Sequence, residues 1–129
     1  MKQEDLQKVG SIFVYSNEMA WFDFGPDHPY KPERASKTYD LCTRYGVMKQ
    51  PWIKILEPKP LAKRLLMLFH ESDYIRILEE ASAGEVRLEM LAHGLGSEDN
   101  PIVPGIYEWS LQAAGGTHEA MDRIMNGAA

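Results

Sequence analysis

The sequence has one cysteine, more acidic than basic residues and no long hydrophobic run. Cys42 has no partner for an internal disulfide, and with no signal peptide at the start this predicts a reducing, cytoplasmic location. The net charge of −5 offers nucleic acid no basic surface. No apolar stretch approaches the about 20 residues that cross a bilayer. We therefore expect neither nucleic acid nor a membrane as a partner.

The common motifs of catalysis and metal binding are also absent from the 129 residues. There is no HExxH, Asp-x-His or CxxC pattern, no G-x-S-x-G and no phosphate-binding loop. Cys42 fits the apolar face of a helix, where a buried small hydrophobe is favoured over a reactive thiol. We predict no catalytic residue and no metal ligand in this chain, because the histidines lack metal-ligand spacing. These histidines are His28, His70, His93 and His118.

What the sequence does contain is an ordinary globular composition and two strand-like runs. The 129 residues are 44% hydrophobic and 26% charged, which suits one domain or one part of a larger one. Residues 11–16 are apolar and rich in strand formers, and residues 52–56 alternate between two prolines, so both runs predict strands. A helix between them, with Pro32 in its first turn and Gly46 after its last, makes a β-α-β unit. Such a unit favours a parallel pair of strands.

Three more helices are predicted after the second strand. Residues 60–69 read as a short helix, and residues 70–84 as another, with Ser72 as N-cap and Gly84 at the end. The last helix runs from about residue 104 to residue 126. Gly115 and Gly116 fall in its middle, where each glycine costs about 1 kcal/mol relative to alanine. Such a pair indicates close backbone packing.

Two irregular segments, residues 17–31 and residues 94–105, are the informative loops. The first carries four aromatic residues together with glycine and proline, which argues for an ordered loop and not for disorder. Functional groups are commonly held on ordered loops at the ends of strands. We therefore expect any functional site of the chain to lie on these two loops.

Three ordered motifs in and beside these loops resemble the zinc-dependent histone deacetylase family. The first is FDFGPDHPYKPERA, the second is FHESDYIRIL and the third is SEDNPIVPGIYEWSLQAAGG. Within this family, the motifs resemble those of bacterial acetoin-utilisation-type deacetylases and class I enzymes. The matching positions are Gly25, His28, Pro29, Lys31, Pro32 and Arg34, then His70, Tyr74, Ile75 and Leu78, then Asp99, Pro101, Gly105, Glu108, Gly115 and Gly116.

The resemblance implies an α/β fold of the arginase and deacetylase type, with a parallel sheet flanked by helices. Residues 1–129 would be a single partial domain, the N-terminal portion of that fold, mostly helical with about two parallel strands. The family's G-G-x-H-H motif, which carries the catalytic histidine pair, and its zinc-ligand motifs do not occur in the sequence. The resemblance thus implies zinc in the full-length enzyme, no cofactor in this chain and no activity for this chain alone.

The resemblance also assigns substrate-binding residues on the first loop. Pro29 and Tyr30 would line a tunnel for an acetylated lysine or another acyl-amine, and Phe22 and Phe24 would pack near its inner end. Prolines fix the backbone, which would preorganise this wall. Arg34 would lie at the inner cavity, where its charge could hold the departing acetate. The alternative for Arg34 is a pair with a carboxylate of its helix.

On the second loop, Asp99 matches the aspartate at the tunnel rim that grips the substrate backbone. A carboxylate can accept two N–H bonds at once. The alternative is that Asp99 is a turn residue before Pro101, and Glu98 leaves the assignment open by one position. His118, directly after the glycine pair, is interpreted as a residue of the helix surface.

Two functions from different classes follow. The chain is either the tunnel-forming segment of a deacetylase or a free-standing, non-catalytic module that binds a protein or an acyl-lysine. In the first case we expect an exposed apolar face, which self-association or pairing with a C-terminal portion would cover.

Overall fold

The computed structural model describes residues 10–127 and has an α/β architecture. Strand β1 (Ser11–Val14) pairs with strand β2 (Ile53–Leu56) in parallel, with Ser11 opposite Ile53 and Val14 opposite Leu56. The connection between them contains α1 (Asn17–Ala20), α2 (Arg34–Arg44) and a short 3-10 helix, η1 (Val47–Lys49). The predicted β-α-β unit with parallel strands is confirmed.

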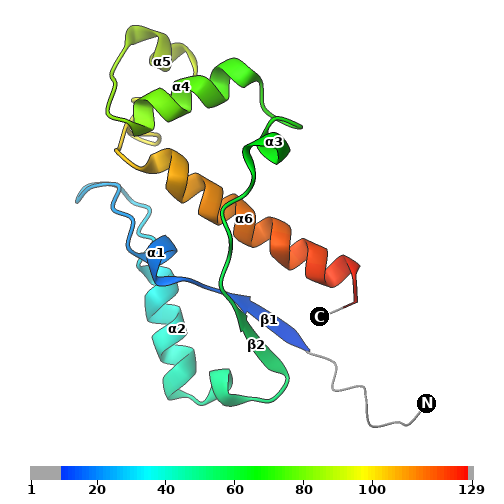
Figure 1. Ribbon diagram of the computed structural model, residues 1–129. Coiled ribbons are helices and arrows are strands. Elements are labelled where there is room, and N and C mark those ends of the chain that lie inside the picture. Colours follow the sequence, from blue (N-terminus) through cyan, green and yellow to red (C-terminus); the bar gives the residue numbers. More distant parts are fainter. Residues whose placement is uncertain (1–9, 128–129) are drawn as a thin grey trace.

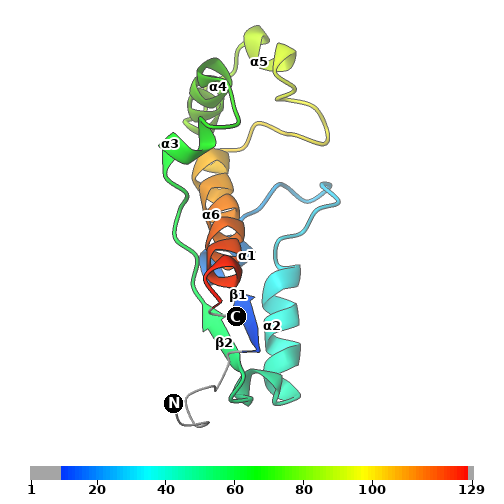
Figure 2. The same cartoon turned by 90° about the vertical axis from the view of Figure 1, so that its right-hand side faces the viewer.

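The two faces of β1 pack against different helices, because successive side chains of a strand point to opposite sides. On one side, Tyr15 stacks on Tyr39 of α2 with ring centroids 4.5 Å apart, and Phe13 lies 6.1 Å from the same ring. On the other side, Val14 lies against Gly116 of α6 (Ile106–Met125). Figure 2 shows the sheet between α2 and α6.

Helix α6 runs through the middle of the molecule and joins the sheet to the remaining helices (Figure 1). The chain between β2 and α3 crosses it at the glycine pair, where the backbone N–H of Leu61 donates to the Leu111 carbonyl at 2.9 Å. A Cβ atom at Gly115 would overlap the carbonyl oxygen of Lys59. The close packing predicted from the two glycines is confirmed.

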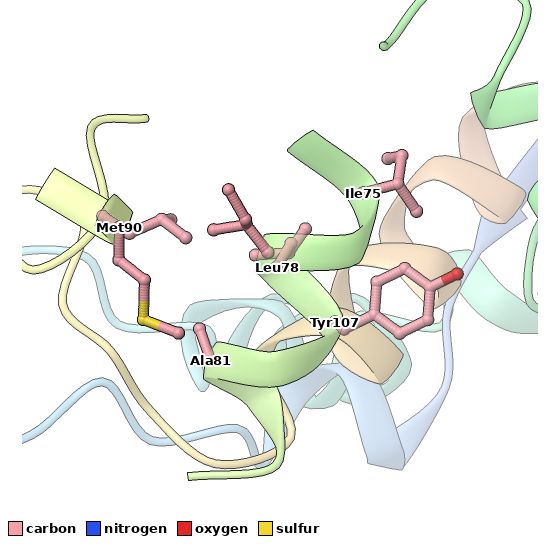
Figure 3. Packing of buried hydrophobic residues seen from close by; sticks show 7 residues of the cluster. Ile75, Leu78, Ala81, Met90 and Tyr107 are labelled. Atoms are coloured by element: carbon pink, nitrogen blue, oxygen red, sulfur yellow. The ribbon is translucent and has the colours of Figure 1, made fainter. Parts of the chain in front are cut away.

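The hydrophobic core lies between α4 (Ser72–Ser82), α5 (Leu88–Ala92) and the first turns of α6 (Figure 3). Residues 75, 78 and 81 recur at helical spacing, so their side chains lie on the side of α4 that faces this core. Its buried members are Ile75, Ile77, Leu78, Ala81, Met90, Leu95 and Tyr107.

Two expectations about helix ends are wrong. Helix α3 spans only Lys63–Leu66, because the next turns close on bonds to the third residue back, from Leu68 to Leu65 and from Phe69 to Leu66. Ser72 is the first residue of α4 and not its cap; the extended Glu71 precedes it and makes no side-chain cap bond. The short helices α1 and α5 fall where no helix was expected.

Several smaller expectations can be compared directly with the structure. Gly46 and Gly84 follow α2 and α4 with positive φ angles of 73° and 94°, as expected for helix-ending glycines. His118 is exposed on α6, as expected, whereas Cys42 is only half-buried. Every helix within residues 10–127 is too short or too polar to cross a bilayer.

An ion pair connects α3 with α4. The Lys63 ammonium lies 2.7 Å from Oε1 of Glu79, and this hydrogen bond lowers the pKa of the Glu79 carboxyl and raises the pKa of Lys63. Burial, and then the charge of Glu79, raises the pKa of the Tyr107 phenol. The pair therefore lies beside the edge of the core.

Candidate functional site

The first loop, predicted for residues 17–31, spans residues 21–33 between α1 and α2 and is folded around its own lysine. The Lys31 ammonium donates to the carbonyl oxygens of Gly25 and Pro26 at 2.8 and 2.9 Å. Gly25 has a φ angle of 103°, a region that favours glycine. A guanidinium nitrogen of Arg34, on the first turn of α2, donates to the Pro29 carbonyl at 3.0 Å. Two cations thus hold the proline-rich backbone in one shape.

The second loop, residues 94–105, is closed by its own hydrogen bonds. Gly96 N–H donates to the Asn100 carbonyl at 2.8 Å, and Asn100 N–H donates to Oγ of Ser97 at 3.1 Å. Leu95 is buried in the core and anchors the start of the loop. Asp99 therefore lies on a tight turn whose base is fixed.

The two loops lie on the same side of α6 (Figure 2). They are in contact through the side chain of His28. His28 Nε2 lies 3.2 Å from the backbone oxygen of Asp99, 71 positions further along the chain. The loops enclose a cleft of about 530 Å³ at this contact. It is lined by Phe24, Gly25, Pro26, Asp27, His28, Pro29, Glu98, Asp99 and Pro101.

Four of the six predicted substrate-binding residues share this region. Pro29, Phe24 and Asp99 line the first cleft, and an adjoining cleft of about 310 Å³ has Tyr30 in its wall together with Phe24 and Asp99. Phe22 lies behind Phe24 and lines a different hollow, beside α2. Arg34 lines none of these three clefts. The structure thus brings four of the predicted residues together and leaves the exposed Arg34 outside their clefts.

Trp109 of α6 lines the adjoining cleft and packs on aromatic residues of the first loop. Its ring packs edge-on against Phe24 at 5.3 Å, stacks on Phe22 at 5.3 Å and meets Tyr30 at 6.1 Å. The Trp109 indole N–H donates to the Met19 carbonyl at 3.0 Å, which fixes the ring. In the sequence, Trp109 falls within the predicted last helix and is not among the predicted site residues. No local pattern indicates this contact, because it depends on how α6 and the first loop are placed relative to each other.

The polar side of the first cleft is acidic. Asp27, Glu98 and Asp99 all line it, and all three are exposed. Asp99 gives its backbone carbonyl to His28, so its carboxylate is not used for that contact. The arrangement combines an aromatic wall with carboxylate acceptors, which suits a ligand with an apolar stem and N–H donors.

The histidines and carboxylates of the described residues do not form a metal-binding cluster. Within residues 10–127, no three His, Cys, Asp or Glu side chains gather into a group that could hold a metal ion. His70 packs beside Tyr74 and Phe69 and lines neither of the two adjoining clefts. The described residues therefore do not provide a zinc ligand set.

Comparison with known proteins gives a consistent result. A family model described as histone deacetylase domain matches residues 28–129. The chain is 33% identical over 120 residues to the acetoin utilization protein AcuC of Bacillus subtilis (strain 168), covering 92% of this chain and 30% of that protein. It is 27% identical over 130 residues to histone deacetylase RPD3 of Saccharomyces cerevisiae, covering 98% of this chain and 29% of that protein.

A third relative is type-1 histone deacetylase 1 of Dictyostelium discoideum, which is 31% identical over 107 residues. That match covers 81% of this chain and 21% of the relative. The chain thus spans between about a fifth and a third of the length of these curated relatives.

Proposed function

The chain belongs to the histone deacetylase family, and on this premise we propose that it forms one wall and the rim of the substrate tunnel of a lysine or acyl-amide deacetylase. One observation carries the proposal. The Pro29–Tyr30 segment and Asp99 are some 70 residues apart in sequence, yet they line the same pair of adjoining clefts. Local sequence patterns do not explain why these distant residues lie together, whereas contact with a common substrate does.

In this proposal the apolar stem of an acyl-lysine lies along Phe24 and Tyr30. Their rings meet edge-on at 5.6 Å and present a rigid surface that costs little entropy to order. Pro29 restricts the backbone conformation of this segment, and its carbonyl accepts a hydrogen bond from Arg34. Phe22 supports the wall from behind through its contact with Phe24 at 4.9 Å.

Asp99 acts at the rim. Its exposed carboxylate accepts N–H bonds from the substrate backbone on either side of the modified lysine. Charge-assisted bonds of this kind are about twice as strong as neutral ones. They would hold an extended peptide across the opening while the acyl-lysine enters between the loops.

Arg34 has more hydrogen-bond donors than its contact with the first loop uses. One of its nitrogens is engaged by the Pro29 carbonyl, and a guanidinium has five N–H groups in total. We propose that the remaining donors hold the departing acetate once further polypeptide encloses this side of the loop. The described residues supply no zinc ligand set, so the proposal assigns this chain substrate binding and no catalytic group.

A second candidate is a free-standing module that binds an acyl-lysine or a protein without cleaving it. The observation in its favour is that both clefts are formed by this chain alone. We prefer the tunnel segment because α6 and β1 form an apolar groove that another polypeptide would cover. That polypeptide would be either a second copy or a C-terminal portion of such an enzyme. A cytoplasmic location, supported by the single cysteine, is part of the same proposal.

An acetyl-lysine peptide titrated into the isotope-labelled chain and followed by NMR tests the proposal. We expect shift changes at residues 24–30 and 98–101, and we expect Asp99→Ala to abolish them because the rim acceptor is lost. Glu98→Ala is the matched control, since Glu98 lines the same cleft one position away. An equal loss in both variants, or no change at either loop, would contradict the assignment of Asp99.

The strength of binding separates the two candidates. Half of a tunnel should bind in the millimolar range, which corresponds to about −4 kcal/mol. A complete module should reach micromolar affinity, about −8 kcal/mol. Mass spectrometry of the recovered peptide checks cleavage: deacetylation by this chain with stoichiometric zinc would overturn the view that it only binds.

A further inference from the structure

We propose that His28 is a positioning residue that sets the place of Asp99 at the cleft. Its ring bridges the two loops: Nδ1 meets the backbone of Tyr30 and Nε2 meets the backbone oxygen of Asp99. The inference rests on the proposed function only for the role of Asp99 toward a substrate. The bridge itself is a property of this chain.

The contacts favour one tautomer of the neutral ring. The backbone N–H of Tyr30 donates to Nδ1 at 3.2 Å, and a ring nitrogen that accepts a hydrogen bond carries no proton. In a neutral imidazole the proton is then on Nε2, which faces the Asp99 oxygen at 3.2 Å and donates to it. The approach of Nδ1 to the Tyr30 oxygen, at 3.4 Å, is longer and would need the opposite tautomer. One tautomer therefore satisfies both bridging contacts.

Packing holds the ring in this orientation. Phe24 stacks on His28 with centroids 4.9 Å apart and an interplanar angle of 23°. A rotation of the imidazole would lose that stacking and both backbone contacts together. The histidine thus couples the aromatic wall, the first loop and the second loop at a single side chain.

The contact acts on Asp99 through its main chain. The carbonyl of Asp99 is fixed by His28, and the following N–H of Asn100 is fixed by Ser97 within the same turn. The Asp99 side chain projects from a peptide held on both sides. Without the His28 donor, the turn would be held only by its own bonds, and the carboxylate would sample more positions.

Two variants separate the two ends of the bridge. In His28→Gln the side-chain amide nitrogen lies about where Nε2 lies, so the donor toward Asp99 is kept. In His28→Asn the shorter amide can serve Tyr30 but does not reach the second loop. A merely structural role for the ring would make both variants fail alike, whereas positioning predicts rescue by the glutamine variant alone.

The test is NMR on the 129-residue chain. Long-range proton–nitrogen correlation of the wild type reports the tautomer, and we expect a proton on Nε2 and none on Nδ1. Backbone order parameters of Asp99 and Asn100 should be about 0.85 in the wild type and His28→Gln, and should fall below about 0.6 in His28→Asn. A proton on Nδ1, or equal order parameters in the wild type and both variants, would overturn the inference.

Failure of the proposed function would look different. If acetyl-lysine peptide shifts no resonance but the tautomer and order parameters are as expected, the positioning bridge stands and the substrate assignment falls. If the peptide binds and Asp99→Ala abolishes binding, while His28→Asn leaves both affinity and order unchanged, the substrate assignment stands and the bridge falls. A wild-type ring protonated on Nδ1 would overturn the bridge even if a variant does not fold.

Discussion

Among single residues, Ser82 shows how one buried hydroxyl can serve two elements. It lies at the last position of α4, yet it accepts the backbone N–H of Tyr107 at 3.0 Å and donates to Oε2 of Glu108 at 2.6 Å. Its own carbonyl accepts the N–H of Gly105 at 3.1 Å. Ser82 therefore caps the beginning of α6 from another helix and satisfies donors that the helix itself leaves free.

We predict that Ser82→Ala lowers the free energy of unfolding by about 1–3 kcal/mol, because the buried Tyr107 N–H loses its acceptor. Urea unfolding followed by circular dichroism measures the change. Thr117→Ala is the matched control: it removes an exposed hydroxyl from α6 that bonds only within the helix, at 3.3 Å. A loss below about 0.5 kcal/mol for Ser82→Ala would show that the cap is not needed.

Local sequence rules predicted the role of some residues but not that of Ser82. Gly46 and Gly84 could be assigned as helix ends because a left-handed glycine after an apolar periodic run is a local signal. Ser72 matched the pattern of an N-cap residue by the same kind of rule. In the structure it is the first residue of α4, and the preceding Glu71 makes no side-chain cap hydrogen bond. The cap at α6 comes from a residue 25 positions away, and short-range patterns contain no information about such a partner.

At the scale of elements, the closest approach is between α6 and the chain that leaves β2. Gly115 and Gly116 are both buried, and the backbone at Lys59 lies directly over the first of them. A helix made of larger residues could not lie this near the sheet. The two glycines therefore set the distance between α6 and the layer that carries the first loop.

We predict that Gly115→Ala destabilises the chain by about 3 kcal/mol or more, since the added methyl would overlap main-chain atoms that cannot turn away. The sign is informative, because alanine in an open helix position would stabilise by about 1 kcal/mol. Gly116→Ala gives a graded comparison: its nearest neighbour is a Val14 methyl at 3.0 Å, so we expect a smaller loss. Thermal unfolding measures both, and a stabilised Gly115→Ala would contradict the packing.

The predictability of elements followed their length and periodicity. The strands, α2, α4 and α6 have clear patterns and were found. The predicted extent of α3 is too long because residues 67–69 are apolar. Leu68 and Phe69 are nevertheless 81% and 86% exposed, so no packing contact extends the helix through them. The five-residue α5 has one buried side chain, Met90, and too few turns to show a period.

At the scale of the whole molecule, the site depends on a meeting that no local rule predicts. The cleft forms because α6 carries the second loop at one end while its middle packs on β1, which leads into the first loop (Figure 1). The resemblance of three spaced motifs predicted which residues would meet, and the structure brings Asp99 to Pro29 and Phe24. Trp109 and the bridging contact of His28 were missed, because they follow from the relative placement of α6 and the loop.

The same arrangement leaves an apolar groove of about 400 Å³ along α6 and β1. Met121 and Ile124 on its wall are 57% and 58% exposed, and they lie next to Val14 and Ala120. Exposed apolar surface of this kind is typical of a face that another polypeptide covers. In the isolated chain, the available polypeptide is a second copy.

We therefore predict that the 129-residue chain self-associates through this groove. Ile124→Lys should raise the dissociation constant at least about tenfold, because burying an isoleucine contributes about 1.5–3 kcal/mol and a charge there would lose its water. Met125→Lys is the matched control: Met125 is 77% exposed on the same helix but does not line the groove. Sedimentation velocity over a range of concentrations measures the change. If the wild type stays monomeric at all concentrations, or if both variants weaken association equally, the groove is not the surface that joins the copies.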